Sequence, residues 1–141
     1  MKHLVDTGAF IAFFDSSDNY HQWAINIFDT FSRNRVFTCE VVIAEVVYML
    51  RKRINLYAAD NFLNAIENGS IQIAFKLSDE VSRLRLLMER YKDVPMDLAD
   101  ACIVRMSELE EYYEIVTVDR DFYIYRRNGR QPLNLVTPFE Y

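Results

Sequence analysis

Four acidic residues stand out because apolar segments surround or precede them. Asp6 and Asp119 each follow a segment with the apolar character of a short strand, whereas Glu45 and Asp100 each lie inside an apolar segment with helical length. A carboxylate in apolar surroundings costs several kcal/mol unless another group pairs with it. Four acids placed in this way along the whole chain suggest that folding brings them to one shared cation.

Each acid also has a structural interpretation when taken singly. Asp6 could cap the helix that follows it, and Asp97 could cap the helix predicted directly after it, at 98–109. Glu45 could pair with a core-facing cation or lie on an exposed helix face. Asp119 and Asp121 both suit a turn after a strand. Together, however, clustered carboxylates repel one another, and a hard ion such as Mg²⁺ or Mn²⁺ would remove that repulsion.

Other kinds of catalytic site find little support. His3 and His21 are solitary, and no Cys/His spacing resembles a zinc site. The sequence has no phosphate-binding glycine loop, no dinucleotide-binding glycine motif and no nucleophile elbow. The motif that begins at Asp6 lacks the second aspartate, two residues on, of an aspartyl-phosphate phosphatase. Cys39 and Cys102 both lie in apolar segments, which favours free thiols in a reducing compartment.

Length and composition indicate one folded domain over residues 1–141. The chain has 141 residues, of which 51% are hydrophobic and 14% aromatic, which excludes a disordered chain. The first strand-like segment begins at Met1, so we expect no signal peptide, and no apolar stretch reaches the roughly 18 residues of a membrane span. We therefore expect a soluble, cytoplasmic protein.

The net charge of −5 argues weakly against nucleic-acid binding, because phosphate contacts need cations. Net charge is an average, however, and a basic rim could still surround an acidic cleft. Solvated surface charge is the alternative interpretation of these cations. The candidate RNA-binding residues are Arg51, Lys52, Arg53, Arg120, Arg126 and Arg127, with Arg130 close by.

Apolar periodicity predicts strands that alternate with helices or helix pairs. The expected strands are 3–5, 36–38, 71–74, 115–118 and 135–137. The expected helices are 9–14, 21–31, 41–53, 57–66, 78–91 and 98–109. This alternation indicates an α/β fold in which helices cover both faces of a mainly parallel sheet. Ligands bind outside the carboxyl ends of such strands, which is where Asp6 and Asp119 are expected.

Five segments, in order and at suitable spacing, resemble motifs of the PIN-domain family, and within it the VapC-type ribonuclease toxins of toxin–antitoxin pairs. These segments are 5–9, 20–24, 42–46, 95–101 and 117–122. The resemblance covers nearly the whole chain.

The resemblance implies a compact three-layer α/β/α fold and an endoribonuclease that depends on Mg²⁺ or Mn²⁺ and uses metal-activated water. It also implies a homodimer and neutralisation by a small cognate antitoxin. By motif position, the catalytic, metal-holding residues would be Asp6, Glu45, Asp100 and Asp119. The supporting residues would be Thr7, Asp97, Thr117 and Asp121. Asp119 and Asp121 are both plausible as the fourth ligand.

Two other functions remain open from the sequence. One is a PIN-like interaction module without catalytic activity, although such a module has no use for the acids. The other is a metal-dependent nuclease or phosphatase that acts on DNA or in housekeeping RNA processing.

Homodimer contacts are expected from large aromatic residues on predicted helices, namely Phe28, Phe31, Tyr57 and Phe62.

Overall fold

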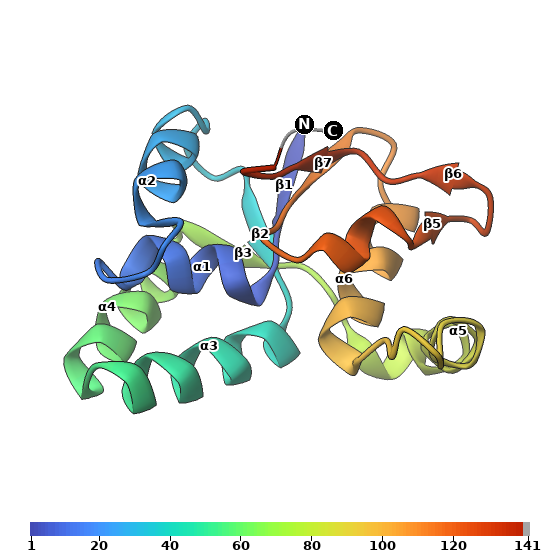
Figure 1. The fold of residues 1–141 in the computed structure, drawn as a ribbon, viewed down its shortest axis with the longest axis horizontal. Coiled ribbons are helices and arrows are strands. Elements are labelled where there is room, and N and C mark those ends of the chain that lie inside the picture. Colours follow the sequence, from blue (N-terminus) through green and yellow to red (C-terminus); the bar gives the residue numbers. More distant parts are fainter. Residues whose placement is uncertain (140–141) are drawn as a thin grey trace.

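The computed structural model describes residues 1–139 and contains a central sheet of five parallel strands, in the order β3-β2-β1-β4-β7 (Figure 1). The strands are β1 (Lys2–Val5), β2 (Val36–Thr38), β3 (Ile71–Ile73), β4 (Tyr113–Val116) and β7 (Leu135–Val136). Strand β1 is central and pairs with β2 on one side and β4 on the other. The carboxyl ends of these three strands therefore lie on the same side of the sheet, which we call its carboxyl edge.

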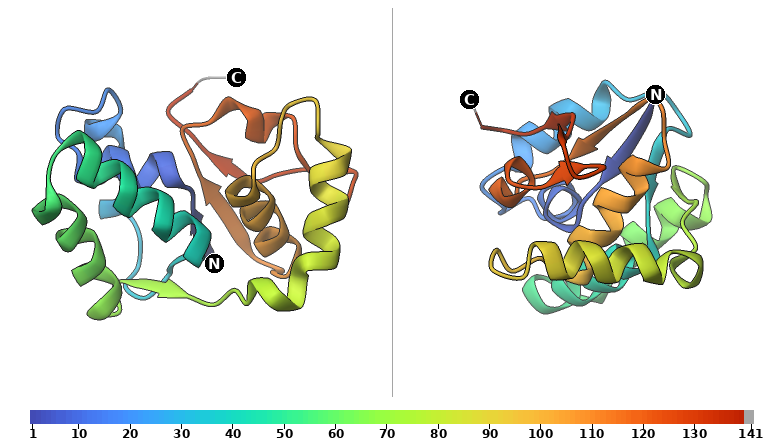
Figure 2. Two further views of the ribbon diagram at one scale, coloured as in Figure 1. Left: turned by 90° about the horizontal axis from the view of Figure 1, so that it is seen from below. Right: turned by 90° about the vertical axis from the view of Figure 1, so that its right-hand side faces the viewer.

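Helices cover both faces of the sheet, which confirms the expected three-layer α/β/α fold (Figures 1 and 2). One face carries α1 (Thr7–Phe14), α2 (His21–Asp29), α3 (Glu40–Arg53) and α4 (Leu56–Glu67). The other carries α5 (Leu77–Arg90), α6 (Leu98–Glu108) and the short 3₁₀ helix η1 (Arg120–Tyr123). Within the described residues, no helix combines the length and apolar character that a bilayer span requires.

The core forms where apolar strands meet apolar helix faces. Leu4 and Val5 of β1 and Ile115 and Val116 of β4 are fully buried, as expected for central strands covered on both sides. Helix α6 is buried along most of its length, because its run 101–104 is apolar on every side. The acids that flank these segments are consequently held by a rigid, dry framework.

One pair of short strands was not predicted from the sequence. Strands β5 (Arg126–Arg127) and β6 (Gln131–Pro132) form an antiparallel hairpin. Asn128 and Gly129 make its turn with positive φ angles of 52° and 77°. The Asn-Gly pair is a hairpin signal, but its flanks lack the apolar alternation that usually accompanies one.

The four aromatic residues expected at a dimer contact have different environments. The prediction is wrong for Phe62, which is 0% exposed and packs against Phe10 in the core. Phe28 and Phe31 are half-buried and contact each other, with ring centroids 5.4 Å apart. Tyr57 is 77% exposed. A small core thus buries more aromatic surface than the composition suggested.

Candidate metal centre

Three of the predicted acids converge at the carboxyl edge of the sheet. Asp6, Asp100 and Asp119 each offer a carboxylate oxygen, and these three atoms lie within 4.8 Å of one another. Asp6 directly follows β1, Asp119 follows the neighbouring strand β4, and Asp100 lies in the first turn of α6. The parallel pairing of β1 with β4 brings Asp6 and Asp119 together.

Asp6 is held by a strand-end hydroxyl and does not act as a helix cap. Its side chain makes no capping hydrogen bond to α1. Instead, Thr117 donates from Oγ1 to Asp6 Oδ2 at 3.1 Å, and the same hydroxyl accepts from the amide of Asp119 at 3.0 Å. Thr117 is fully buried and therefore fixes two members of the cluster relative to each other.

Asp100 has a partner that the sequence did not indicate. The Tyr125 hydroxyl donates to Asp100 Oδ2 at 2.7 Å, and both side chains are buried. Edge-to-face contacts with Tyr91 and Phe122 hold the Tyr125 ring. Asp97 accepts from the Asp100 amide at 2.8 Å, which confirms its interpretation as the N-cap of α6.

Of the two candidates after β4, Asp119 is the one whose carboxylate joins the cluster. Its side chain also accepts a hydrogen bond from the Asp121 amide at 2.9 Å. Asp121 thus supports the site through its backbone, and its carboxylate is not among the converging groups found in residues 1–139.

Glu45 lies outside the three-aspartate cluster. Its Oε2 accepts a 2.8 Å hydrogen bond from the hydroxyl of Thr7, the residue that follows Asp6. Within the described part of the chain, Glu45 has no ion-pair partner, so the alternative of a buried ion pair does not hold. Thr7 therefore links Glu45 to the site without bringing its carboxylate into the group of three.

Burial and mutual repulsion raise the pKa values of the three aspartates. Burial raises the pKa of Asp6 to about 7, opposed by hydrogen bonds from Thr7 and Thr117. Burial, together with the charge of Asp6, raises the pKa of Asp100 to about 8. Burial is also the main cause that raises the pKa of Asp119. Each group therefore favours its neutral form unless a positive charge is supplied.

The residues present fit a hard divalent cation. All three groups offer oxygen ligands, which Mg²⁺ and Mn²⁺ prefer. Among residues 1–139, no Lys, Arg or His side chain forms an ion pair with any of the three aspartates. A bound cation would supply the positive charge that the protein itself does not.

The candidate RNA-binding cations differ in whether their side chains already have a partner in the protein. Arg53 pairs with Asp18 at 3.3 Å and lies 3.9 Å from Asp15. Arg126 and Arg127 donate to backbone carbonyls of η1 and of the end of α6. The Arg120 guanidinium lies 3.8 Å from the ring centroid of Phe139. The remaining two, Arg51 and Lys52, are exposed on α3.

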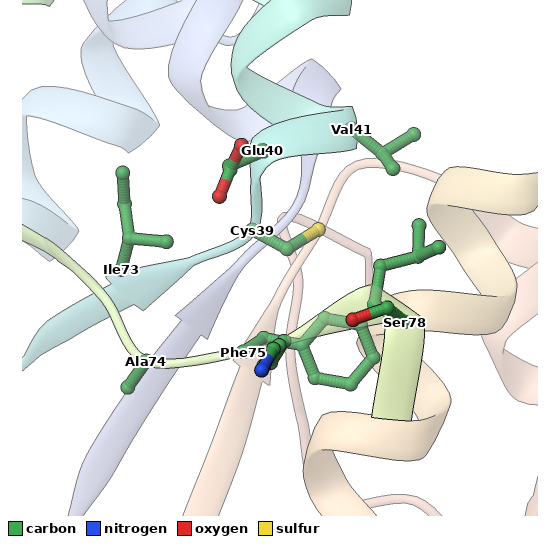
Figure 3. A pocket seen from close by; sticks show the side chains of 9 residues that line it. Cys39, Glu40, Val41, Ile73, Ala74, Phe75 and Ser78 are labelled. Carbon is green, nitrogen blue, oxygen red and sulfur yellow. The ribbon is translucent and has the colours of Figure 1, made fainter. Parts of the chain in front are cut away.

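A cavity of about 610 Å³ opens at the same edge of the sheet, beyond β2 and β3 (Figure 3). Its lining comes from residues 39–41 at the start of α3 and from residues 73–78, which lead into α5. Cys39, which lines it, is buried, and both Cys39 and Cys102 are free thiols, as expected. None of the three aspartates is among the residues that line this cavity.

Three comparisons relate this chain to known proteins. The PIN domain family matches residues 3–128. Ribonuclease VapC26 of Mycobacterium tuberculosis is 25% identical over 117 residues, which cover 83% of this chain and 86% of that protein. The crystal structure of Mycobacterium tuberculosis VapC20, a Sarcin-Ricin loop cleaving toxin, has the same fold. It superposes with a TM-score of 0.77 at 17% identity and covers 85% of this chain and 92% of that one. The family match spans most of the sequence, and the chain therefore belongs to the PIN domain family.

Proposed function

We propose that this protein is a Mg²⁺- or Mn²⁺-dependent endoribonuclease and the toxin of a toxin–antitoxin pair, acting in the cytoplasm. The observation that carries the proposal is the group of three carboxylates within 4.8 Å, which has no cationic partner among the described residues. Membership of the PIN family and similarity to Ribonuclease VapC26 support RNA as the substrate.

Some of these residues would bind the cation, and others orient the side chains that bind it. Asp6, Asp100 and Asp119 would hold the ion. When bound, the ion supplies an activated water and neutralises charge on the phosphate. Thr117 orients Asp6 through its hydroxyl, and Tyr125 orients Asp100. Glu45, tied to the site by Thr7, would accept a proton at the margin of the cluster.

The proposed partners follow from the same assignment. A homodimer and a small antitoxin are proposed, and the antitoxin would inhibit by placing an Arg or Lys against the aspartates in place of the metal. Cleavage should then cease when the product of a small adjacent gene is added. If that partner binds while cleavage continues, this mode of neutralisation is wrong.

The first test compares Asp6→Asn and Asp100→Asn with the wild-type protein. Each change is nearly isosteric but removes a charge that the metal needs, so cleavage of single-stranded RNA should fall at least about 100-fold. The assay follows cleavage of a labelled RNA, and of DNA of the same sequence, with Mg²⁺, Mn²⁺ or EDTA.

Asp60→Asn is the matched control, because Asp60 is exposed on α4 and outside the cluster. Its activity should equal that of the wild type. Cleavage that persists in EDTA, or that survives both cluster substitutions, contradicts the proposed mechanism. Cleavage of DNA in preference to RNA contradicts the proposed substrate.

A further inference from the structure

An exposed aromatic ring and two cations share the outer face of α3. Tyr48 is 61% exposed, and together with Ala44, Val47, Arg51 and Lys52 it lines a groove of about 430 Å³. The Lys52 Nζ lies 5.7 Å from the centroid of the Tyr48 ring. In the left-hand view of Figure 2, α3 lies nearest the viewer, with no other element in front of it.

Arg51 and Lys52 are free to bind an anion. Within residues 1–139, neither forms an ion pair or donates a hydrogen bond to another residue. Six other cations of the described chain form ion pairs with carboxylates. The engaged cations are Lys2, Arg53, Lys76, Arg83, Lys92 and Arg105. Arg51 and Lys52 are consecutive and both exposed, so this face of α3 presents two cations that no carboxylate of residues 1–139 neutralises.

This face begins at Glu45, which Thr7 links to the candidate metal centre. Glu45, Tyr48 and Lys52 are spaced by three and four residues, which places them along one stripe of the helix. The stripe extends about 10 Å along the helix axis from Glu45 to Lys52. Glu45 itself is bonded to Thr7, which adjoins Asp6. A strand that leaves the aspartates past Glu45 would therefore meet Tyr48 and then Lys52.

We propose that this face of α3 binds the single-stranded RNA that flanks the bond to be cut, an inference that rests on the proposed function. One base stacks on Tyr48, and backbone phosphates contact Arg51 and Lys52. An aromatic ring beside a basic track is the usual means of holding a single strand with little sequence preference. Two adjacent cations without a carboxylate partner complement the charge of a phosphodiester backbone, which is why we assign the face to RNA.

The experiment measures RNA binding in the Asp100→Asn background, in which the strand is not cut. The probe is a fluorescein-labelled single-stranded RNA without internal pairing, followed by anisotropy over a range of salt concentrations. Tyr48→Ala should weaken binding about 10-fold, whereas Tyr48→Phe should retain most of the affinity. Arg51→Ala with Lys52→Ala should lower the slope of log K against log salt by about 1.4, equivalent to two phosphate contacts.

Tyr57→Ala and Arg85→Ala serve as matched controls on other helices. Tyr57 is an exposed ring on α4, and Arg85 is an exposed cation on α5. Both variants should bind the RNA as the background protein does. A duplex of the same sequence should show no loss with Tyr48→Ala, because its bases are not available to stack on the ring.

Two outcomes overturn the inference, and a third separates it from the proposed function. Unchanged affinity for the single strand in both the Tyr48 and the Arg51/Lys52 variants does so, and it leaves the proposed function intact if the wild-type protein still cleaves RNA with Mg²⁺. Loss of self-association or antitoxin binding, without loss of RNA binding, identifies the face as a protein contact. If the wild type binds the strand through these residues but cleaves none, the proposed function fails and the binding face stands.

Discussion

Each carboxyl group of the cluster has a neutral donor but no cation among the described residues. Thr117 donates to Asp6, Tyr125 to Asp100, and the Asp121 amide to Asp119. Neutral donors stabilise a carboxylate less than a charged partner does, so the pKa values of all three aspartates stay above the ordinary value. The donors thus orient the ligands and leave the charge of the site for an ion to balance.

The first residue-level prediction concerns Tyr125→Phe. This change removes the only hydroxyl that donates to Asp100 in the described structure, while the ring keeps its contacts with Tyr91 and Phe122. Groups that orient a metal ligand are commonly worth about 10- to 100-fold in metal affinity or activity. We expect Mn²⁺ affinity and RNA cleavage to fall about 10-fold, measured by calorimetric titration and by the cleavage assay.

Tyr113→Phe separates this effect from the loss of any buried hydroxyl. Tyr113 is also buried, but its hydroxyl accepts from the Asn134 amide, away from the aspartates. That variant should keep its Mn²⁺ affinity whatever happens to its stability. If Tyr125→Phe also binds Mn²⁺ like the wild type, Tyr125 serves packing alone.

Residues that directly follow apolar strands were the ones most readily predicted from the sequence. Asp6 and Asp119 could be placed together because parallel strands share an edge. Tyr125 could not be assigned to the site from the sequence. Its contact with Asp100 depends on how the chain after η1 approaches α6, and no local sequence pattern encodes that approach. Glu45 was expected beside the aspartates, but helix geometry alone does not fix how far its carboxylate extends.

The strands and helices were largely predictable because their apolar periodicity agrees with their final packing. The predicted strand at 36–38 matches β2, and the helix predicted over 41–53 differs from α3 by one residue. The predicted strand at 115–118 is wrong in its bounds, because β4 ends at Val116 and Thr117 turns its hydroxyl toward Asp6. The deviation therefore falls where the chain departs from regular structure to build the site.

The close approach of α1 to the loop after β4 gives a prediction for Gly8→Ala. A Cβ at Gly8 would lie 2.5 Å from Val118 Cγ2, and the χ1 angle of valine has little freedom. The gain in helix propensity, about 1 kcal/mol, should be outweighed by overpacking of about 1–3 kcal/mol. We expect a lower free energy of unfolding and weaker Mn²⁺ binding, because Val118 adjoins Asp119.

A second substitution tests the proposed clash directly. Val118→Ala removes the methyl groups that a Cβ at Gly8 would meet, so the Gly8→Ala/Val118→Ala protein should recover Mn²⁺ affinity relative to Gly8→Ala alone. Urea unfolding of the four proteins gives the coupling energy between the two positions. If the two substitutions have strictly additive effects on the free energy of unfolding, the contact with Val118 is not the reason that position 8 requires glycine.

The folded molecule as a whole carries its least compensated negative charge at one edge, and this sets how its stability depends on pH. The pKa values of Asp6 and Asp100 are raised from 3.8 to about 7 and about 8. Between these limits the folded state holds protons that the unfolded state has lost, so metal-free stability falls as pH rises. Asp15 and Glu108 act in the opposite sense, because their pKa values are lowered, but only near and below 3.8 and 4.5.

We therefore expect the metal-free protein to be most stable at about pH 5. From pH 8 to pH 6 its free energy of unfolding should rise by at least about 1 kcal/mol, or about 3 °C in Tm for a chain of this size. Thermal melts in EDTA across this range provide the measurement. The Asp6→Asn/Asp100→Asn protein should show a much flatter profile, and an equally steep one would assign the dependence to other groups.

Addition of a divalent cation should reverse this trend, since the ion binds the ionised carboxylates that destabilise the metal-free fold. An ion at 100 times its Kd stabilises the native state by about 2.7 kcal/mol, provided that it does not bind the unfolded chain. Protons compete with the ion for Asp6 and Asp100, so the gain from Mn²⁺ should be large at pH 8 and should shrink toward pH 5. Asp60→Asn should respond as the wild type does, and the double aspartate variant should not respond. A gain from Mn²⁺ that is independent of pH, or that persists in the double variant, would place the ion elsewhere on the molecule.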